Sequence, residues 1–72
     1  MRRYKACKLF GAKVAKIRKS KKMSQENLAD KVGIHRNHMG RIERGETNPP
    51  LNTVVKIGRE LKSSPANLLS FK

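Results

Sequence analysis

The sequence predicts an all-α protein of five short helices, and three observations support this fold class. Apolar residues recur at the spacing of a helix face, as Phe10, Val14 and Ile17 do. Residues that start helices and glycines that end them divide the chain at short intervals. No stretch shows the apolar–polar alternation of a half-buried strand. At 72 residues the chain has the size of one small domain, which we divide into a basic N-terminal arm at residues 1–8 and a helical domain at residues 9–72.

Local signals delimit the first two helices. The first is expected to run from Phe10 to the segment Ser20–Lys22. The second begins after Ser24, whose hydroxyl suits an N-cap, and it ends before Gly33, which suits the residue just past a helix. Asn27 occupies the place at which a capping box has Glu or Gln, so we expect the strict box to be absent. The buried stripe of this second helix is Leu28, Ala29 and Val32.

A third helix follows after a very short turn. Residues 33–35 alone separate the second helix from the next apolar pair, Met39 and Ile42. Two helices of about eight to ten residues, joined by a turn of three or four residues that contains glycine, are the signature of a helix-turn-helix. Gly45 then closes the third helix.

The remainder of the chain predicts a loop and two more helices. Residues 46–50, ETNPP, form the loop, because a residue that precedes proline avoids helical backbone angles. The fifth helix is short and has Ser64 as its N-cap and Pro65 at its first position. Between loop and fifth helix, a fourth helix is indicated by apolar or small residues at helical spacing, namely Leu51, Val54, Val55, Gly58 and Leu61.

Charge is the strongest global signal. Eighteen Lys and Arg against five Asp and Glu give a formal net charge of +13. An excess of this size attracts polyanions, and we interpret it as a nucleic-acid signal. No apolar run approaches about 18 residues, so we expect no membrane span and no membrane partner. Cys7 is the only cysteine, which excludes an internal disulfide and suits a reducing cytoplasm, and we expect it to be a small buried or half-buried filler.

The third helix carries the side chains with the most informative chemistry. Met39 and Ile42 define its buried side, and Glu43 lies nearer to the core flank. Arginine can bind guanine with two hydrogen bonds and asparagine can bind adenine in the same way, so an outward face of these residues is typical of major-groove recognition. That face is expected to carry Asn37, Gly40, Arg41 and Arg44, with Arg36 at its margin.

His35 and His38 admit three interpretations, as metal ligands, as an acid–base pair or simply as surface residues. A zinc site needs three or four ligands, and Cys7 lies far upstream in the sequence. No serine, cysteine or pair of carboxylates stands at a recognisable catalytic spacing from either histidine. We therefore expect no metal, no cofactor and no enzymatic activity, and we assign both histidines to a DNA-binding edge.

The segments MSQENLADKVGI and RIERGETNPP and the closing NLL resemble the phage repressor and Cro type of helix-turn-helix domain, the XRE family, over roughly residues 10–69. The resemblance implies a compact five-helix lambda-repressor-like fold, with the second helix across the DNA backbone and the third in the major groove. It implies base reading by Arg36, Asn37 and Arg41, and an ion pair between Arg18 and Glu43 that ties the first helix to the third. The resemblance and the basic surface together indicate contacts to the DNA backbone from Gln25, His35, His38, Arg44, Asn48 and Lys19.

Five positions depart from the pattern of that family, namely His35, Gly40, Glu60, Lys62 and Ser63. Lys62 stands where a helix-ending glycine is common, and Gly40 stands where a small or polar residue is usual. A glycine within a helix costs about 0.5–1 kcal/mol relative to alanine. Two explanations for Gly40 remain open at this stage, namely a close approach to DNA and a simple softening of the helix.

These features lead to one principal hypothesis and two alternatives. The principal hypothesis is a sequence-specific transcriptional regulator that binds double-stranded DNA, reading a palindromic operator as a homodimer. The first alternative is a non-specific nucleic-acid-binding module driven by the basic segments. The second is an antitoxin or another protein-interaction module, whose partner is a toxin or RNA polymerase. An enzyme is the weakest candidate, because a chain of this length leaves little room to support a catalytic site.

Overall fold

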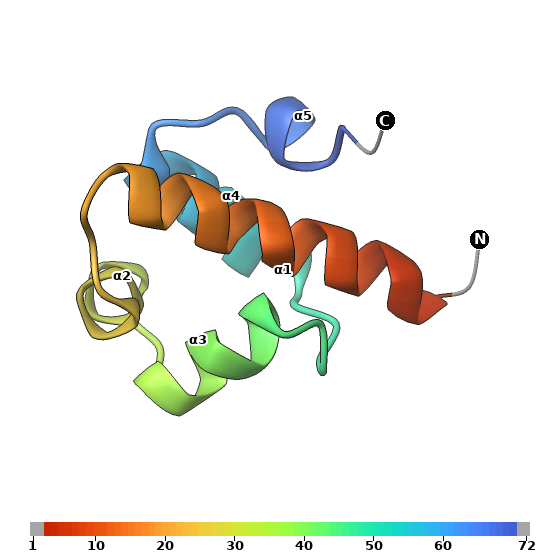
Figure 1. Ribbon diagram of the computed structural model, residues 1–72, viewed down its shortest axis with the longest axis horizontal. Helices are drawn as coiled ribbons and strands as arrows, with labels where there is room; N and C mark the ends of the chain where they lie inside the picture. The colour runs from red at the N-terminus through yellow and green to blue at the C-terminus, as the bar shows by residue number, and fades with distance from the viewer. Residues whose placement is uncertain (1–2, 71–72) are drawn as a thin grey trace.

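The computed structural model describes residues 3–70, and this range folds into five helices without any strand (Figure 1). The helices are α1 (Arg3–Ser20), α2 (Gln25–Val32), α3 (Arg36–Glu43), α4 (Leu51–Leu61) and α5 (Pro65–Leu68). Each of the five helices predicted from the sequence is present, and the all-α fold class is confirmed.

α1 is longer than the helix predicted from the sequence. It begins at Arg3, so residues 3–8, which we expected to form a basic arm, are helical. Lysine and alanine in this segment are strong helix formers, and Lys8 packs closely against the backbone at Gly45 in the loop after α3. Residues 1 and 2 of the expected arm lie outside the described range. At its other end the helix stops at Ser20, within the segment predicted.

The ends of α2 are fixed by hydrogen bonds from its own residues. The Ser24 hydroxyl accepts the backbone N–H of Asn27 at 2.9 Å, and the Asn27 side-chain oxygen accepts the N–H of Ser24 at 3.4 Å. A reciprocal capping box is therefore present, and our expectation of its absence was wrong, because the amide of asparagine takes the role of Glu or Gln. Gly33 ends the helix with φ at +88°, a left-handed conformation that glycine adopts without strain.

The core lies where the first four helices converge, and α5 adds Leu68 to it. α4 contributes through the line Val54, Ile57 and Leu61, so Ile57, which the sequence pattern had not singled out, is fully buried. Leu51, at the start of the same helix, is 73% exposed, although it belongs to the predicted apolar pattern. The buried apolar residues are Phe10, Val14, Leu28, Ala29, Val32, Met39, Ile42, Val54, Ile57, Leu61 and Leu68.

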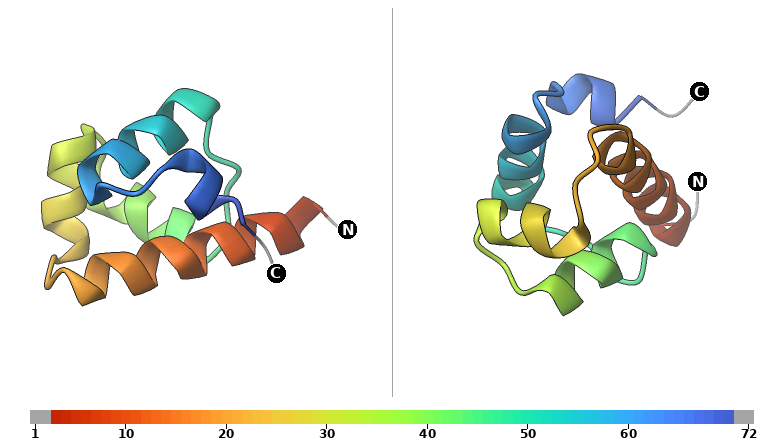
Figure 2. Two further views of the ribbon diagram at one scale, coloured as in Figure 1. Left: turned by 90° about the horizontal axis from the view of Figure 1, so that it is seen from above. Right: turned by 60° about the vertical axis from the view of Figure 1, so that its left-hand side comes forward.

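The helices are arranged so that one side of α3 faces away from the rest of the fold. α3 lies on the side of the molecule opposite α5, as Figure 1 and the right-hand view of Figure 2 both show. α1 and α4 lie between them, and α2 leads into α3 through the tight turn at residues 33–35. The outward face of α3 is therefore left uncovered by the other described helices.

α1 and α3 are in close contact at Gly11. A Cβ atom placed on this residue would lie 2.6 Å from the carbonyl oxygen of Glu43 and closer still to that of Ile42. These neighbours are backbone atoms and cannot swing aside, so the contact requires a residue without a side chain. Gly11 thus sets how near the C-terminal end of α3 comes to α1.

Candidate nucleic-acid interface

Three side chains predicted to read bases lie on the uncovered side of α3. Arg36, Asn37 and Arg41 are all exposed, whereas Met39 and Ile42 on the same helix are fully buried. Asn37 and Arg41 are four residues apart and therefore share a face of the helix. The exposed side of α3 thus offers planar hydrogen-bonding groups from its first turn to its last.

His35 forms the start of α3. Its backbone is extended, and its Nδ1 atom accepts the backbone N–H of Asn37 at 3.0 Å, as a serine or threonine hydroxyl would at an N-cap. An imidazole can do this only while Nδ1 carries no proton. His38 lies half-buried one turn further on. Within the described residues, no three His, Cys, Asp or Glu side chains gather in a way that would hold a metal ion.

A buried network holds α3 against the first two helices. Arg18 donates from Nε to Glu43 Oε2 at 2.7 Å and from Nη2 to Glu43 Oε1 at 3.0 Å, and these are the two residues that the family resemblance pairs. Their side chains are only 9% and 5% exposed. Arg18 also donates to the carbonyl of Met23 at 2.7 Å. This charge-assisted contact joins α1 to α3 across the core.

Gln25 joins the same network from the first residue of α2. Its Nε2 atom donates to Glu43 Oε1 at 2.9 Å, so one carboxylate is shared between α1 and α2. Glu43 therefore receives hydrogen bonds from both neighbouring helices and fixes the orientation of α3 relative to them. The half-buried Gln25 side chain accordingly braces α3 at the place where that helix meets α2.

Two exposed carboxylates hold arginines of the candidate interface, and the sequence pattern did not predict either pair. Glu26 Oε2 accepts a hydrogen bond from Arg36 Nη1 at 3.2 Å. Glu46 accepts two from Arg44, at 2.6 Å from Nε and 3.4 Å from Nη2. The sequence carried no helical spacing to indicate these pairs, because the first joins two helices and the second spans the turn at Gly45.

The contact between Arg44 and Glu46 also shifts the pKa values of both side chains. The hydrogen bond to Glu46, and then its negative charge, raises the pKa of the Arg44 guanidinium. The hydrogen bond from Arg44 lowers the pKa of the Glu46 carboxyl, and the positive charges of Arg44 and Arg41 lower it further. Desolvation raises this pKa, but by less than the hydrogen bond lowers it. The pair therefore remains charged at neutral pH.

Our prediction that Gly40 lies on the outward face of α3 was wrong. It is buried, because the side chains of Arg44 and Gln25 lie over it. A Cβ atom at this position would be 3.1 Å from Arg44 Nη1 and 3.4 Å from Gln25 Oε1. The helical pattern treated Met39 and Ile42 as the only buried direction, whereas α2 and its Gln25 side chain cover a second flank of α3.

Alanine at the two close-packed glycines is expected to act in opposite directions. Gly11→Ala should lower the free energy of unfolding by about 1–3 kcal/mol, because its Cβ would collide with backbone carbonyls of α3. Gly40→Ala should raise it by about 0.5 kcal/mol, because alanine is the better helix former and only the ends of flexible side chains need to move. Urea denaturation of both variants measures the two changes. If both substitutions changed the free energy of unfolding in the same direction, this packing would be contradicted.

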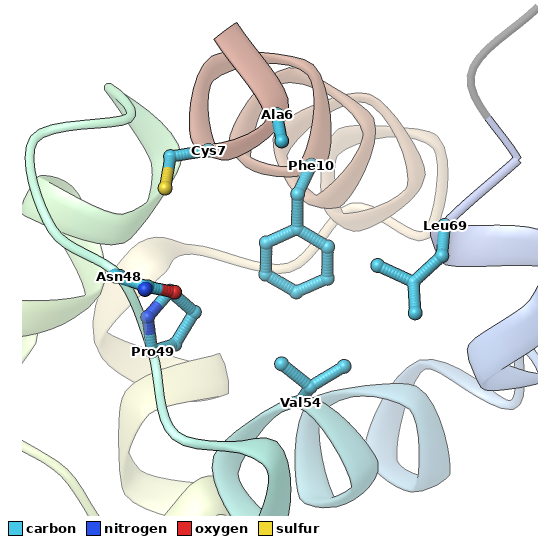
Figure 3. Close-up of a pocket in the computed structure, with 7 residues that line it drawn as sticks. All are labelled: Ala6, Cys7, Phe10, Asn48, Pro49, Val54 and Leu69. Carbon is cyan, nitrogen blue, oxygen red and sulfur yellow. The ribbon is translucent and has the colours of Figure 1, made fainter. Parts of the chain in front are cut away.

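A small apolar pocket of about 120 Å³ lies beside the loop that follows α3. In Figure 3 the Phe10 ring lies at the centre of the pocket, with Val54 and Leu69 beside it, and the Cys7 sulfur points toward Asn48 and Pro49. Cys7 is half-buried here, as expected for a small filler. Asn48, one of the predicted backbone contacts, is exposed at the rim of this pocket, and Lys19, another, is exposed on α1.

α2 and α3 together define a helix-turn-helix domain, in which a tight turn presents the second helix to solvent. The family described as Helix-turn-helix matches residues 14–68, and the chain belongs to this family. The XRE-type resemblance of the sequence and its five-helix lambda-repressor-like fold are thereby confirmed. Among residues 3–70, no helix combines the length and apolar character needed to cross a membrane.

Known proteins of similar sequence and structure are regulators. Control protein C.BamHI of Bacillus amyloliquefaciens is 47% identical over 64 residues, which make up 88% of this chain and 79% of that protein. The restriction-modification controller protein C.AhdI from Aeromonas hydrophila has a TM-score of 0.83 at 34% identity, covering 86% of this chain and 94% of that chain. The P22 c2 repressor, solved in complex with a synthetic operator, has a TM-score of 0.80 at 30% identity, covering 85% of this chain and 92% of that chain. The present chain is a transcriptional regulator with a DNA-binding helix-turn-helix fold.

Proposed function

We propose that the protein is a cytoplasmic, sequence-specific regulator that inserts α3 into the major groove of double-stranded DNA. The observation that carries this proposal is the uncovered side of α3, where Arg36, Asn37 and Arg41 are exposed next to a tight turn. Arginine and asparagine are the side chains that bind guanine and adenine with paired hydrogen bonds. We assign base reading to these three residues.

The surroundings of α3 supply candidate contacts to the phosphate backbone. His35 and Gln25 lie at the N-terminal ends of α3 and α2, where backbone N–H groups and the helix dipole favour an anion. The half-buried His38 and the exposed Arg44, Asn48 and Lys19 complete the set of proposed backbone contacts. A chain with a net charge of +13 is suited to this sequence-independent part of binding.

We further propose that the protein binds as a homodimer on a palindromic operator. Leu51 is 73% exposed and Leu69 is 46% exposed, and Val55 lies one turn after Leu51 on the same side of α4. We assign the neighbouring apolar side chains of Leu51 and Val55 to contact with a second copy, because adjoining exposed apolar side chains mark interaction sites. Two recognition helices placed by a two-fold axis read half-sites about 34 Å apart. The P22 c2 repressor, solved in complex with a synthetic operator, supports the operator-binding part of this proposal.

A binding titration against labelled duplexes tests the proposed function. If each bound unit makes about six phosphate contacts, the logarithm of the binding constant should fall against the logarithm of salt concentration with a slope near −5. At moderate salt, one group of duplexes should be bound at least about 1000-fold more tightly than random sequence. Equal affinity for every duplex would favour a non-specific nucleic-acid-binding module instead. Absence of binding to any duplex would favour a protein-interaction module.

A further inference from the structure

The two arginine–carboxylate pairs of the interface differ in how much of the guanidinium they occupy. Glu26 contacts Arg36 through Nη1 alone, at 3.2 Å. Glu46 contacts Arg44 through Nε and Nη2, which form one edge of the guanidinium fork. A phosphate group that binds arginine with two hydrogen bonds uses an edge of the same kind. Glu46 therefore occupies an edge of the Arg44 guanidinium that is suited to binding phosphate.

The backbone around Arg44 holds this pair in place. Gly45 adopts φ at +74°, and the N–H of Glu46 donates to the carbonyl of Arg41 at 2.9 Å, so the chain turns back and brings Glu46 beside Arg44. Gly40 lies directly beside the guanidinium, since a Cβ atom there would be 3.1 Å from Nη1 and 3.9 Å from Cζ of Arg44. Arg44 is thus bounded by Gly40 on one side and by Glu46 along one edge.

A carboxylate at this position opposes the attraction between the interface and a polyanion. Glu46 brings a negative charge beside an arginine that is proposed to contact phosphate, and it is 49% exposed. When phosphate approaches, either the Arg44 edge leaves Glu46 or the two anions share one guanidinium. Both possibilities reduce what the contact contributes to binding.

We propose that Glu46 holds Arg44 in the free protein and thereby limits the sequence-independent affinity for DNA. This inference rests on the proposed function, in which α3 and its flanks face DNA. Glu46 then sets the absolute affinity, whereas Arg36 and Asn37 set the discrimination between sequences. Such a limit matters for a strongly basic chain, because competing non-specific sites on a genome outnumber the operator by many orders of magnitude.

Glu46→Gln tests the inference, because the amide keeps the shape of the side chain and removes its charge. We expect the dissociation constant to fall roughly three- to tenfold for every duplex at low salt, and the slope against salt to steepen by about 0.9, as for one additional phosphate contact. The ratio between preferred and random duplexes should remain unchanged. The pair is exposed, so thermal unfolding of the variant should stay close to that of the unmodified protein.

Two matched variants identify the origin of any gain. Glu60→Gln makes the same change of charge in the last turn of α4 and should alter the dissociation constant by less than about twofold. In an Arg44→Ala background, Glu46→Gln should give no gain, because the released guanidinium is missing.

The possible results separate this inference from the proposed function. An equal gain from Glu60→Gln, or a gain that persists without Arg44, would attribute the effect to net charge and overturn the inference. Weaker binding by Glu46→Gln would make Glu46 a residue that positions Arg44 for DNA, which also overturns it. Failure of the unmodified protein to bind any duplex would contradict the proposed function itself and the inference with it.

Discussion

Arg18→Ala is expected to lower the free energy of unfolding by about 3–5 kcal/mol, the largest stability effect that the structure predicts for a polar residue. The substitution leaves the Glu43 carboxylate, only 5% exposed, with Gln25 as its remaining side-chain donor. It also removes the hydrogen bond that Arg18 donates to the Met23 carbonyl. Small domains are stable by only about 5–15 kcal/mol, so a change of this size removes a large part of the total. Urea denaturation followed by circular dichroism measures it.

Two further variants show whether the cost arises from an unpaired buried charge. Replacing both partners with apolar residues, as Arg18→Met with Glu43→Leu, should restore stability to within about 1–2 kcal/mol of the unmodified protein, because no buried charge is then left alone. Glu46→Ala, which breaks an exposed pair, should cost less than about 1 kcal/mol. An Arg18→Ala variant as stable as Glu46→Ala would contradict the role assigned to the buried network.

Arg36→Ala and Asn37→Ala are each expected to reduce the discrimination between DNA sequences by about 1–3 kcal/mol, or roughly 5- to 150-fold. The loss should be confined to the base pairs that the removed side chain reads, because a paired hydrogen bond distinguishes one base edge from the others. Both residues are exposed on the uncovered side of α3, and neither belongs to the core. Dissociation constants for a preferred duplex and its single-base variants measure the change.

Lys19→Ala provides the matched control for base reading. Lys19 is exposed on α1 and is assigned to the DNA backbone, so its loss should weaken binding to all duplexes alike and make the salt dependence less steep. If Arg36→Ala and Asn37→Ala behaved in the same way as Lys19→Ala, the assignment of the reading residues would be wrong.

The helix boundaries that depend on local chemistry were the most predictable part of the fold. Ser24 and Gly33 marked the ends of α2 because a hydroxyl cap and a left-handed glycine act within their own turn of chain. The start of α1 was not predictable in this way, since the segment that includes Lys8 contacts Gly45, far along the sequence. Gly11 carried no local signal for the same reason, because its neighbours belong to α3.

The candidate site was predictable where it depends on one helix and unpredictable where it depends on several. The outward positions of Arg36, Asn37 and Arg41 followed from the period of α3 alone. The burial of Gly40 depends on how α2 crosses α3. The Arg44–Glu46 pair depends on a left-handed turn at Gly45, and such contacts do not follow from helical spacing.

Selection of bound duplexes from a random pool tests the central claim most directly. The enriched sequences are expected to contain two inverted half-sites centred about 10 base pairs apart, as required when a two-fold dimer places its recognition helices one DNA turn apart. Enrichment should weaken at the positions read by Arg36 and Asn37 when the alanine variants are used. A pool that remains random after repeated selection would contradict sequence-specific binding, and a motif without inverted symmetry would contradict the homodimer.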